Sequence, residues 1–275
     1  MILRGTIPSA VLGMDTGITI ITPGTYHLEA LKERAGRPYK TAYLLHGLYG
    51  NHGSWADNTM LLVYANDYHM VFIMPEAARS FYTDMAYGLN YFTYISEELP
   101  LICSSLFQIS SDRNDTFVIG GSMGGYGALK CSLFHPDIFG HCLALSSAYL
   151  FLKEDLRGMR QNRLDHNCFR QSDLTSGEGD VRLLQDMRAA FGEKLECKEE
   201  DDLLSLLDSR MKEKRNLPDI RMICGKEDPY LEENRRFAGE LNKRAGLAFS
   251  YKEIPGSHDW YYFNEALRTG LSECF

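Results

Sequence analysis

The chain has 275 residues, of which 44% are hydrophobic and 24% are charged, as in ordinary globular proteins. That length allows one large domain or two small ones, and it buries a substantial core without disulfides or metals. The formal net charge is −8 and the acidic residues are dispersed, which argues against a nucleic-acid-binding surface. No stretch approaches about 18 consecutive apolar residues, so we expect no membrane span.

The cysteines indicate the compartment. There are seven, an odd number, and no CxxC motif occurs. Most lie in apolar runs, where a thiol behaves as a small hydrophobic group, and this favours a reducing environment over a disulfide framework. The first residues, MILRGTIPSAVLG, lack the long apolar segment of a signal peptide. We therefore expect a cytoplasmic protein.

Strand patterns recur along the chain. The alternating segments SAVLG (9–13) and GITIITP (17–23) predict one or two antiparallel strands at a sheet edge. Five continuous apolar runs predict buried strands, and a last strand is predicted near the end of the chain. The five runs are 41–48, 70–77, 116–121, 141–149 and 219–225, and the last strand is 248–256.

Helical patterns separate these strands. They cover 59–68, 94–107 (kinked or divided by Pro100), 124–136, 231–246 and 259–275. The alternation predicts an α/β fold with a mostly parallel sheet and helices on both faces. Residues 150–217 are charged and helix-prone, so we interpret them as a helical cap inserted into a single domain, 1–275. A separate domain is the alternative, but the segment shows no apolar centre of its own.

Residues 120–130, GGSMGGYGALK, place one serine among five glycines. Ser122 fits the pattern G-x-S-x-G between a predicted strand and a predicted helix, which is the context of a nucleophile elbow. A phosphate-binding loop is the weaker interpretation, because neither GxxxxGK[ST] nor GxGxxG occurs. Close helix–sheet packing would explain one or two glycines. Ser122 is therefore the predicted nucleophile.

A serine nucleophile needs a histidine base and an acid that orients it. In this fold the acid follows the serine along the chain, and the histidine follows the acid. His258 lies in the loop after the last predicted strand, where active-site loops gather, and is the predicted base. The preceding strand is followed by KEDPYLEEN, which offers Glu227 and Asp228. We favour Asp228, because Pro229 fixes the backbone after it; capping the next helix is its alternative role.

The other histidines are assigned structural roles. His135 is expected to cap the last carbonyls of a helix, His141 to be structural, and His166 to lie on the surface of the cap. His46 and His52 are interpreted as packed or hydrogen-bonded, since no cysteine or carboxylate stands at metal-ligand spacing. No metal or organic cofactor is expected.

An oxyanion hole should complete the site. One donor is expected to be the backbone N–H of Met123, directly after the nucleophile at a helix N-terminus. The second is expected from the loop HGLYGNHGSW, where we favour the N–H of Leu48. Three aromatic residues, Trp55, Tyr82 and Trp260, are candidate walls of an acyl or aryl pocket, with simple packing as the alternative.

Five ordered segments of the chain resemble the esterase D branch of the α/β-hydrolases, and within it the tributyrin esterase and cinnamoyl (feruloyl) esterase group. They read LLHGLYGNHGSW, SFYTDMAYGLNYFTYISEELP, GGSMGGYGALK, CGKEDPYLEEN and PGSHDWYYF. The resemblance covers nearly the whole chain and is weakest over 150–217. It implies an α/β-hydrolase fold and a carboxylesterase with Ser122, Asp228 and His258 as its triad. It also implies that the amides of Leu48 and Met123 form the oxyanion hole.

The expected activity is hydrolysis of short-chain acyl or small aryl esters through an acyl-enzyme. An S-formylglutathione hydrolase-like thioesterase and a carbohydrate acetyl esterase are the alternatives. A non-catalytic binding module would usually lack a triad member, and a peptidase would need peptide-end recognition. The expected partner is a small-molecule ester, and an apolar cap surface could support a homodimer.

Overall fold

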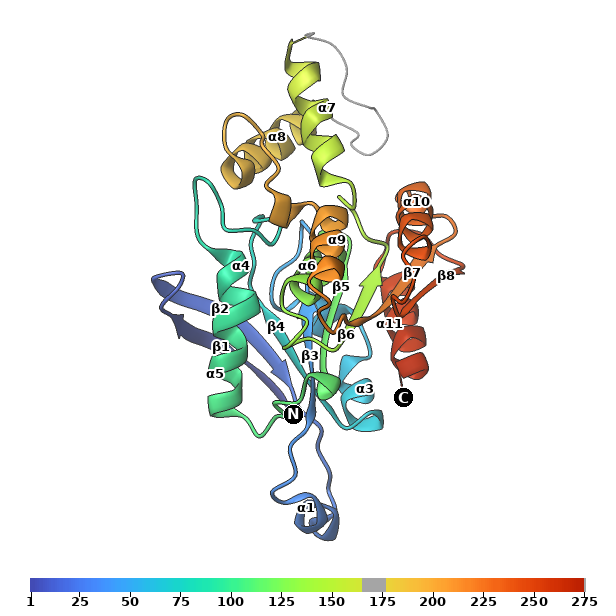
Figure 1. Ribbon diagram of the computed structural model, residues 1–275. Helices are drawn as coiled ribbons and strands as arrows, with labels where there is room; N and C mark the ends of the chain where they lie inside the picture. Colours follow the sequence, from blue (N-terminus) through green and yellow to red (C-terminus); the bar gives the residue numbers. More distant parts are fainter. Residues whose placement is uncertain (165–176, 275) are drawn as a thin grey trace.

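The computed structural model describes residues 1–164 and 177–274, with side chains for 1–161 and 182–274 (Figure 1). His166 lies outside the described residues. Eight strands form one sheet in the order β1-β2-β4-β3-β5-β6-β7-β8. Their bounds are β1 Ile2–Ser9, β2 Met14–Ile21, β3 Lys40–Leu45, β4 Met70–Pro75, β5 Thr116–Gly121, β6 His141–Leu145, β7 Asp219–Gly225 and β8 Phe249–Ile254.

The sheet is mostly parallel. Strands β3 to β8 pair in parallel, whereas β1 with β2 and β2 with β4 pair antiparallel. The side chains of a strand alternate between the two faces, and both faces are buried: Tyr43 and Leu45 enter one core, and Ala42 and Leu44 enter the other. This explains why the parallel strands read as continuous apolar runs, and it confirms the predicted fold class.

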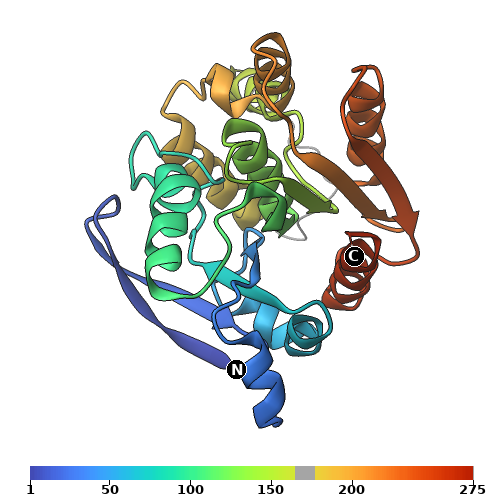
Figure 2. The same cartoon turned by 60° about the horizontal axis from the view of Figure 1, so that its bottom comes forward.

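Helices cover both faces of the sheet, as Figure 2 shows. Apolar residues of α5, α6, α9 and α10 pack in one core, and those of α2, α3 and α11 pack in the other. The bounds are α1 Leu28–Arg34, α2 Ser54–Asn58, α3 Leu61–Asp67, α4 Tyr91–Thr93, α5 Leu99–Leu106, α6 Met123–Phe134, α7 Leu152–Leu164, α8 Gly177–Phe191, α9 Leu203–Lys212, α10 Leu231–Asn242 and α11 Trp260–Cys274. Among these described helices, none is long and apolar enough to cross a membrane.

The segment 150–217 lies between β6 and β7. Its described part contains α7, α8, the 3₁₀ turn η3 (Glu199–Asp201) and α9, and no strand. Its apolar side chains, among them Leu156, Met187 and Leu207, join the core that contains α6. The segment therefore has no need of a core of its own. Figure 1 shows α7 and α8 at the end of the molecule opposite α1.

The predicted antiparallel strands at a sheet edge are confirmed, and the segment 17–23 overlaps β2, but the predicted bounds of the first strand were wrong. Strand β1 spans Ile2–Ser9, and the next residues form the turn into β2, where Gly13 has a φ of +66°. The apolar pattern of this turn arises because Leu12 is buried in the core. Glu98 accepts hydrogen bonds from the N–H groups of Ala10 and Val11 at 2.7 and 3.3 Å, which holds the turn.

The predicted helix around Pro100 is helical without a break from Tyr91 to Leu106, but it changes type along its length. A π-helical turn, η1 (Tyr94–Glu98), joins α4 to α5, and Pro100 lies in the first turn of α5. Proline lacks the N–H that continues a helical ladder, and a π-helical turn directly before it is a common site of such an irregularity. A further 3₁₀ turn, η2 (Arg113–Asp115), precedes β5.

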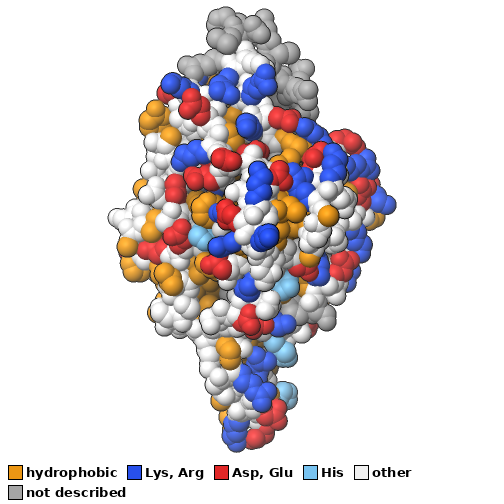
Figure 3. All heavy atoms as spheres, viewed as in Figure 1, with side chains coloured by type: hydrophobic (Ala, Val, Ile, Leu, Met, Phe, Trp, Pro, Cys, Tyr) orange, Lys and Arg blue, Asp and Glu red, His pale blue; other side chains and the backbone are white. Residues whose placement is uncertain are grey.

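The surface of one face carries interspersed acidic and basic side chains (Figure 3).

Candidate active site

Ser122 occupies a strained turn between β5 and α6. Its φ is 58° and its ψ is −125°, a backbone conformation that non-glycine residues rarely adopt. A Cβ on Gly120 would lie 2.0 Å from the carbonyl oxygen of Gly124, and a Cβ on Gly124 would lie 2.2 Å from that of Leu45. Only glycine fits at either position. The turn therefore depends on these glycines.

Ser122 and His258 line one cavity of about 620 Å³. Its wall comes from the loop after β3, the β5–α6 turn, helices α7 and α8, and the loops after β7 and β8. In parallel α/β sheets the loops that follow the strands meet at one edge, which is where ligands bind. The cavity therefore lies at the edge expected of a substrate site.

His258 is paired with Asp228. Its Nδ1 lies 2.8 Å from Asp228 Oδ2, and the Asp228 side chain is fully buried. Asp228 Oδ1 accepts a hydrogen bond from the N–H of Tyr230 at 2.9 Å, so the same carboxylate also holds the start of α10. The alternative, Glu227, instead accepts the N–H of Gly256 at 2.6 Å. Within the described residues no hydrogen bond joins His258 to Ser122; such bonds often tighten only when substrate binds.

The loop after β3 carries a tight turn, in which Gly50 N–H donates to the Gly47 carbonyl at 2.9 Å. Within the described residues, the N–H groups of Leu48 and Met123 have no hydrogen-bond partner. The Leu48 carbonyl, on the next peptide, accepts a hydrogen bond from Arg79 at 3.3 Å. Arg79 is in turn bound by Asp186 of α8, at 2.6 Å from its Nε.

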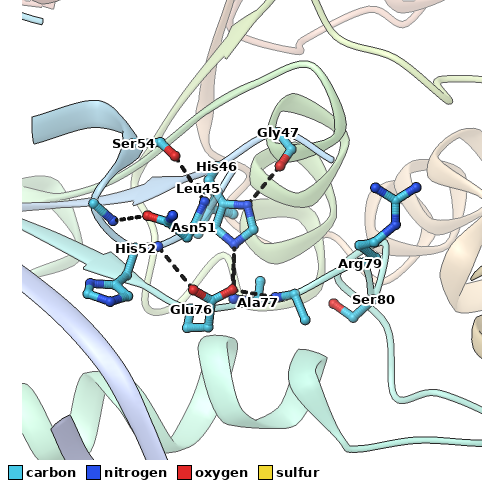
Figure 4. A network of polar contacts seen from close by, with 12 residues as sticks. Leu45, His46, Gly47, Asn51, His52, Ser54, Glu76, Ala77, Arg79 and Ser80 are labelled. Carbon is cyan, nitrogen blue, oxygen red and sulfur yellow. Dashed lines mark hydrogen bonds and ion pairs between the residues drawn. The ribbon is translucent and has the colours of Figure 1, made fainter. Parts of the chain in front are cut away.

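The His46 side chain holds this loop through polar contacts, which Figure 4 shows. Its Nδ1 is 2.8 Å from the Gly47 carbonyl, and its Nε2 accepts the N–H of Ala77 at 3.0 Å, which together assign the proton to Nδ1. His52 Nδ1 lies 2.8 Å from the hydroxyl of Thr19. Both histidines are hydrogen-bonded, as predicted.

Glu76 joins this network. It lies 3.4 Å from His46 Nε2 and accepts the N–H groups of Ala78 at 2.8 Å and His52 at 3.2 Å. Burial raises the pKa of the Glu76 carboxyl, whereas the N–H groups of Ala78 and His52, which donate to it, lower the pKa. Glu76 is therefore a structural carboxylate of the loop.

Two of the three predicted aromatic walls line the cavity. Trp55 and Trp260 meet edge to face, with 5.2 Å between ring centroids, and Trp55 Nε1 donates to the Leu45 carbonyl at 3.0 Å. Tyr82 does not line this cavity, so its assignment as a wall is corrected. It is fully buried, and its hydroxyl donates to the His46 carbonyl at 2.7 Å, which supports the loop from beneath.

The inserted segment supplies lining residues that the sequence did not point to. Asp155 and Met159 of α7 and Leu183 of α8 line the cavity. Nothing in their local pattern distinguishes them from a solvated helix face. Tyr230 also lines the cavity, and it could have been found from its position two residues after Asp228.

Two other histidines have structural surroundings. His141 begins β6, stacks on the ring of Phe117 at 4.4 Å between centroids, and bonds the Asn114 carbonyl at 3.1 Å, which confirms a structural role. His135 ends α6, but its ring does not cap the helix carbonyls. Its Nε2 instead faces Glu97 at 3.4 Å, so the capping prediction was wrong.

The strand–serine–helix turn at the centre of this sheet defines an α/β-hydrolase. Residues 9–274 match the family model Esterase, described as "Putative esterase". An acetyl esterase of Caldicellulosiruptor saccharolyticus is 31% identical over 231 residues, which are 82% of this chain and 79% of that protein. The chain therefore belongs to the Esterase family, and it is a serine esterase, a hydrolase of carboxylic esters.

Solved structures agree with this assignment. Fluorophosphonate-binding serine hydrolase F (FphF) of Staphylococcus aureus has a TM-score of 0.80 and 27% identity, over 100% of this chain and 98% of that one. S-formylglutathione hydrolase (FrmB) of the same organism has a TM-score of 0.79 and 26% identity, with the same coverage. The fold is that of an esterase D-like α/β-hydrolase.

Proposed function

We propose that Ser122, His258 and Asp228 form the catalytic triad of this esterase. The observation that carries the proposal is the 2.8 Å contact between His258 Nδ1 and buried Asp228, in the loops beside a serine held at a positive φ. With Nδ1 bound to the carboxylate, the Nε2 of His258 is the nitrogen left to take a proton. This is the arrangement that turns a serine hydroxyl into a nucleophile.

The reaction proceeds by two acyl transfers. His258 Nε2 takes the hydroxyl proton of Ser122 as Oγ attacks the ester carbonyl, and Asp228 stabilises the resulting imidazolium. The tetrahedral intermediate collapses as His258 returns the proton to the leaving alcohol, which leaves an acyl group on Ser122. His258 then takes a proton from water, which attacks the acyl carbonyl, and returns it to Ser122 as the carboxylic acid departs.

The developing oxyanion is proposed to bind the N–H groups of Leu48 and Met123. Both amides lack other partners within the described residues, and both belong to segments beside Ser122. A Cβ built on Gly47 would lie 3.4 Å from the Ser122 Cβ, which measures how closely the loop approaches the nucleophile. Donors fixed before the reaction stabilise the transition state without reorganisation.

We infer short-chain acyl or small aryl esters as substrates, with Trp55 and Trp260 as pocket walls. A cavity of about 620 Å³ is the size of many small-molecule sites, and much of its wall is aromatic. The similarity to an acetyl esterase supports a small acyl group and makes an acetylated carbohydrate a candidate within this class.

A second candidate is the hydrolysis of S-formylglutathione, favoured by the similarity to a hydrolase of that thioester. The same triad would perform it, since a thioester carbonyl accepts the same nucleophile. The two candidates differ in the leaving group. The thioester releases a thiol that carries the charges of a peptide, whereas the ester releases an alcohol.

We also propose that the enzyme works in the cytoplasm on free small molecules, as one domain with 150–217 as its cap. The six described cysteines are free thiols, which fits a reducing compartment. A homodimer is the alternative to a monomer, and sedimentation would distinguish them.

The test is a comparison of kcat/KM for 4-nitrophenyl acetate, butyrate and octanoate, a feruloyl ester, an acetylated xyloside and S-formylglutathione. Ser122→Ala is the control, and it should lose several orders of magnitude on every active substrate. A pre-steady-state burst of 4-nitrophenol would report the acyl-enzyme. Activity that survives Ser122→Ala would refute the assignment of the nucleophile.

A further inference from the structure

One carboxyl group in the wall of the cavity has no part in the proposed mechanism. Asp155, in the first turn of α7, lines the same cavity as Ser122 and His258. Its side chain has no hydrogen bond or ion pair with any residue that the structure describes. An acid that faces a substrate cavity without a partner interacts directly with whatever enters.

The groups around Asp155 do not neutralise it. Arg236 of α10 is held by Glu154 through two hydrogen bonds of 2.8 and 2.6 Å, so its charge is already engaged. Glu233 of α10 accepts the N–H of Leu150 at 2.6 Å and adds a second carboxyl group nearby. These contacts fix the start of α7 on α10 and thereby the position of Asp155.

Whether Asp155 and Glu233 carry a negative charge depends on the pH. Burial raises the pKa of Asp155 to about 6, and Glu154 adds to the effect while Arg236 opposes it. Burial likewise raises the pKa of Glu233 to about 7, and Asp155 adds to that shift. A carboxyl group is ionised above its pKa, so Asp155 is neutral at pH 5 and negative at pH 8.

The described part of the remaining cavity wall offers no lysine or arginine as a counter-charge. Asp259 also lines the cavity, and it accepts the N–H of Tyr262 at 2.9 Å. The remaining ionisable groups are His258 and the tyrosines 49, 149 and 230.

We propose that Asp155 is a specificity-determining residue of this esterase, which selects uncharged esters and rejects esters that carry a carboxylate. The proposal rests on the proposed function, because it assigns a substrate class to the site of Ser122. A carboxylate in the cavity meets a like charge in partly desolvated surroundings, where repulsion is stronger than in water. By the same reasoning, glutathione thioesters, which carry carboxylates, are poorer substrates than uncharged esters.

The experiment compares ester pairs that differ only in charge. On the acyl side the pair is mono-4-nitrophenyl adipate and its amide, 4-nitrophenyl adipamate; on the alcohol side it is O-acetyl-lactate and O-acetyl-lactamide. We expect wild type at pH 8 to prefer the amide of at least one pair by on the order of tenfold or more in kcat/KM. Asp155→Asn should lose most of that preference. The pair affected tells which side of the ester Asp155 faces.

Two controls separate this effect from general damage. Glu196→Gln removes an equal charge from the exposed surface of the same inserted segment, and it should leave the preference within about twofold because Glu196 does not line the cavity. Turnover of the amide substrates by Asp155→Asn shows that the variant is folded. Lowering the pH from 8 to 5 should reduce the preference in wild type but not in Asp155→Asn.

Equal kcat/KM for both members of both pairs in wild type would overturn the proposal. A preference that persists in Asp155→Asn, or that Glu196→Gln abolishes equally, would overturn it too. Failure to hydrolyse any uncharged ester, or activity that survives Ser122→Ala, would instead refute the proposed function on which it rests.

Discussion

The ion pair of Lys130 with Asp201 is buried between α6 and η3, and its loss has a calculable effect. The two side chains are each 1% exposed, and Lys130 Nζ lies 2.5 Å from Asp201 Oδ1. Lys130 Nζ also donates to the Tyr82 carbonyl at 3.1 Å, and Thr83 donates its hydroxyl to Asp201 Oδ1 at 3.0 Å. The pair therefore ties the inserted segment to the helix that begins at the nucleophile.

Lys130→Met should lower the free energy of unfolding by about 3–5 kcal/mol. Methionine fills the space of the lysine stem, but it leaves the Asp201 carboxylate buried without a counter-charge. Adding Asp201→Asn should recover at least half of the loss, because the amide is neutral and its oxygen still accepts the Thr83 hydroxyl. The recovery separates the cost of an uncompensated charge from the cost of altered packing.

The assay is urea unfolding at pH 7, followed by circular dichroism, on the wild type, both single variants and the double variant. Lys243→Met is the matched control, since Lys243 pairs with Glu240 at the surface with a side chain 69% exposed, and it should change little. A loss of less than about 1 kcal/mol in Lys130→Met would refute the reasoning. A double variant as unstable as Lys130→Met would show that packing, rather than charge, is responsible.

Asp228→Asn should lower kcat by roughly 10³–10⁴-fold with little change in fold, because His258 loses the acceptor that fixes its tautomer; a kcat within tenfold of wild type would contradict the triad. Arg79→Met should lower kcat by about tenfold at nearly constant KM, because the Leu48 peptide loses its anchor; a change in KM alone would argue against that role. The amides of Ala78 and His52 hold the folded-state pKa of Glu76 below its usual 4.5, so its stabilisation is present above pH 4.5 and is lost as the pH falls through the lowered pKa. The free energies of unfolding at pH 7 and pH 3, measured in urea, should therefore differ less in Glu76→Gln than in wild type, by on the order of 1 kcal/mol, and equal losses in both proteins would contradict the shift.

The sheet and the residues at its active edge could be predicted because each depends on local pattern. Buried parallel strands appear in the sequence as apolar runs. A serine with glycines two residues before and after it, directly after such a run, indicates the tight strand-to-helix turn of a nucleophile elbow. His258 and Asp228 were found because each follows a strand, and parallel strands bring the loops that follow them to one edge. The placement of these residues thus follows from topology, without knowledge of any side-chain contact.

The walls of the cavity depend on packing between distant segments, which a local pattern does not record. Tyr82 and Trp55 are both aromatic residues of loops near the site, yet only Trp55 lines the cavity. The Tyr82 side chain lies in the core, where its hydroxyl donates a hydrogen bond to the His46 carbonyl. Nothing in the sequence around Asp155 distinguishes it from a solvated charge, because the contacts that orient its helix join distant segments. They are the burial of Leu152 and Leu156 in the core and the hydrogen bonds of Glu154 and Glu233.

The link from Asp186 through Arg79 to the Leu48 carbonyl has a consequence for how this enzyme can diverge. Surface segments tolerate sequence change more readily than a sheet does, and here α8 is bonded through Arg79 to the loop that carries a proposed oxyanion donor. A recombinant chain that received α8 from a relative without an acid at this position would leave the guanidinium of Arg79 unpaired beside Leu48. New substrate ranges should therefore arise through exchanges that carry Arg79 and Asp186 together, or through single replacements elsewhere on the inserted helices.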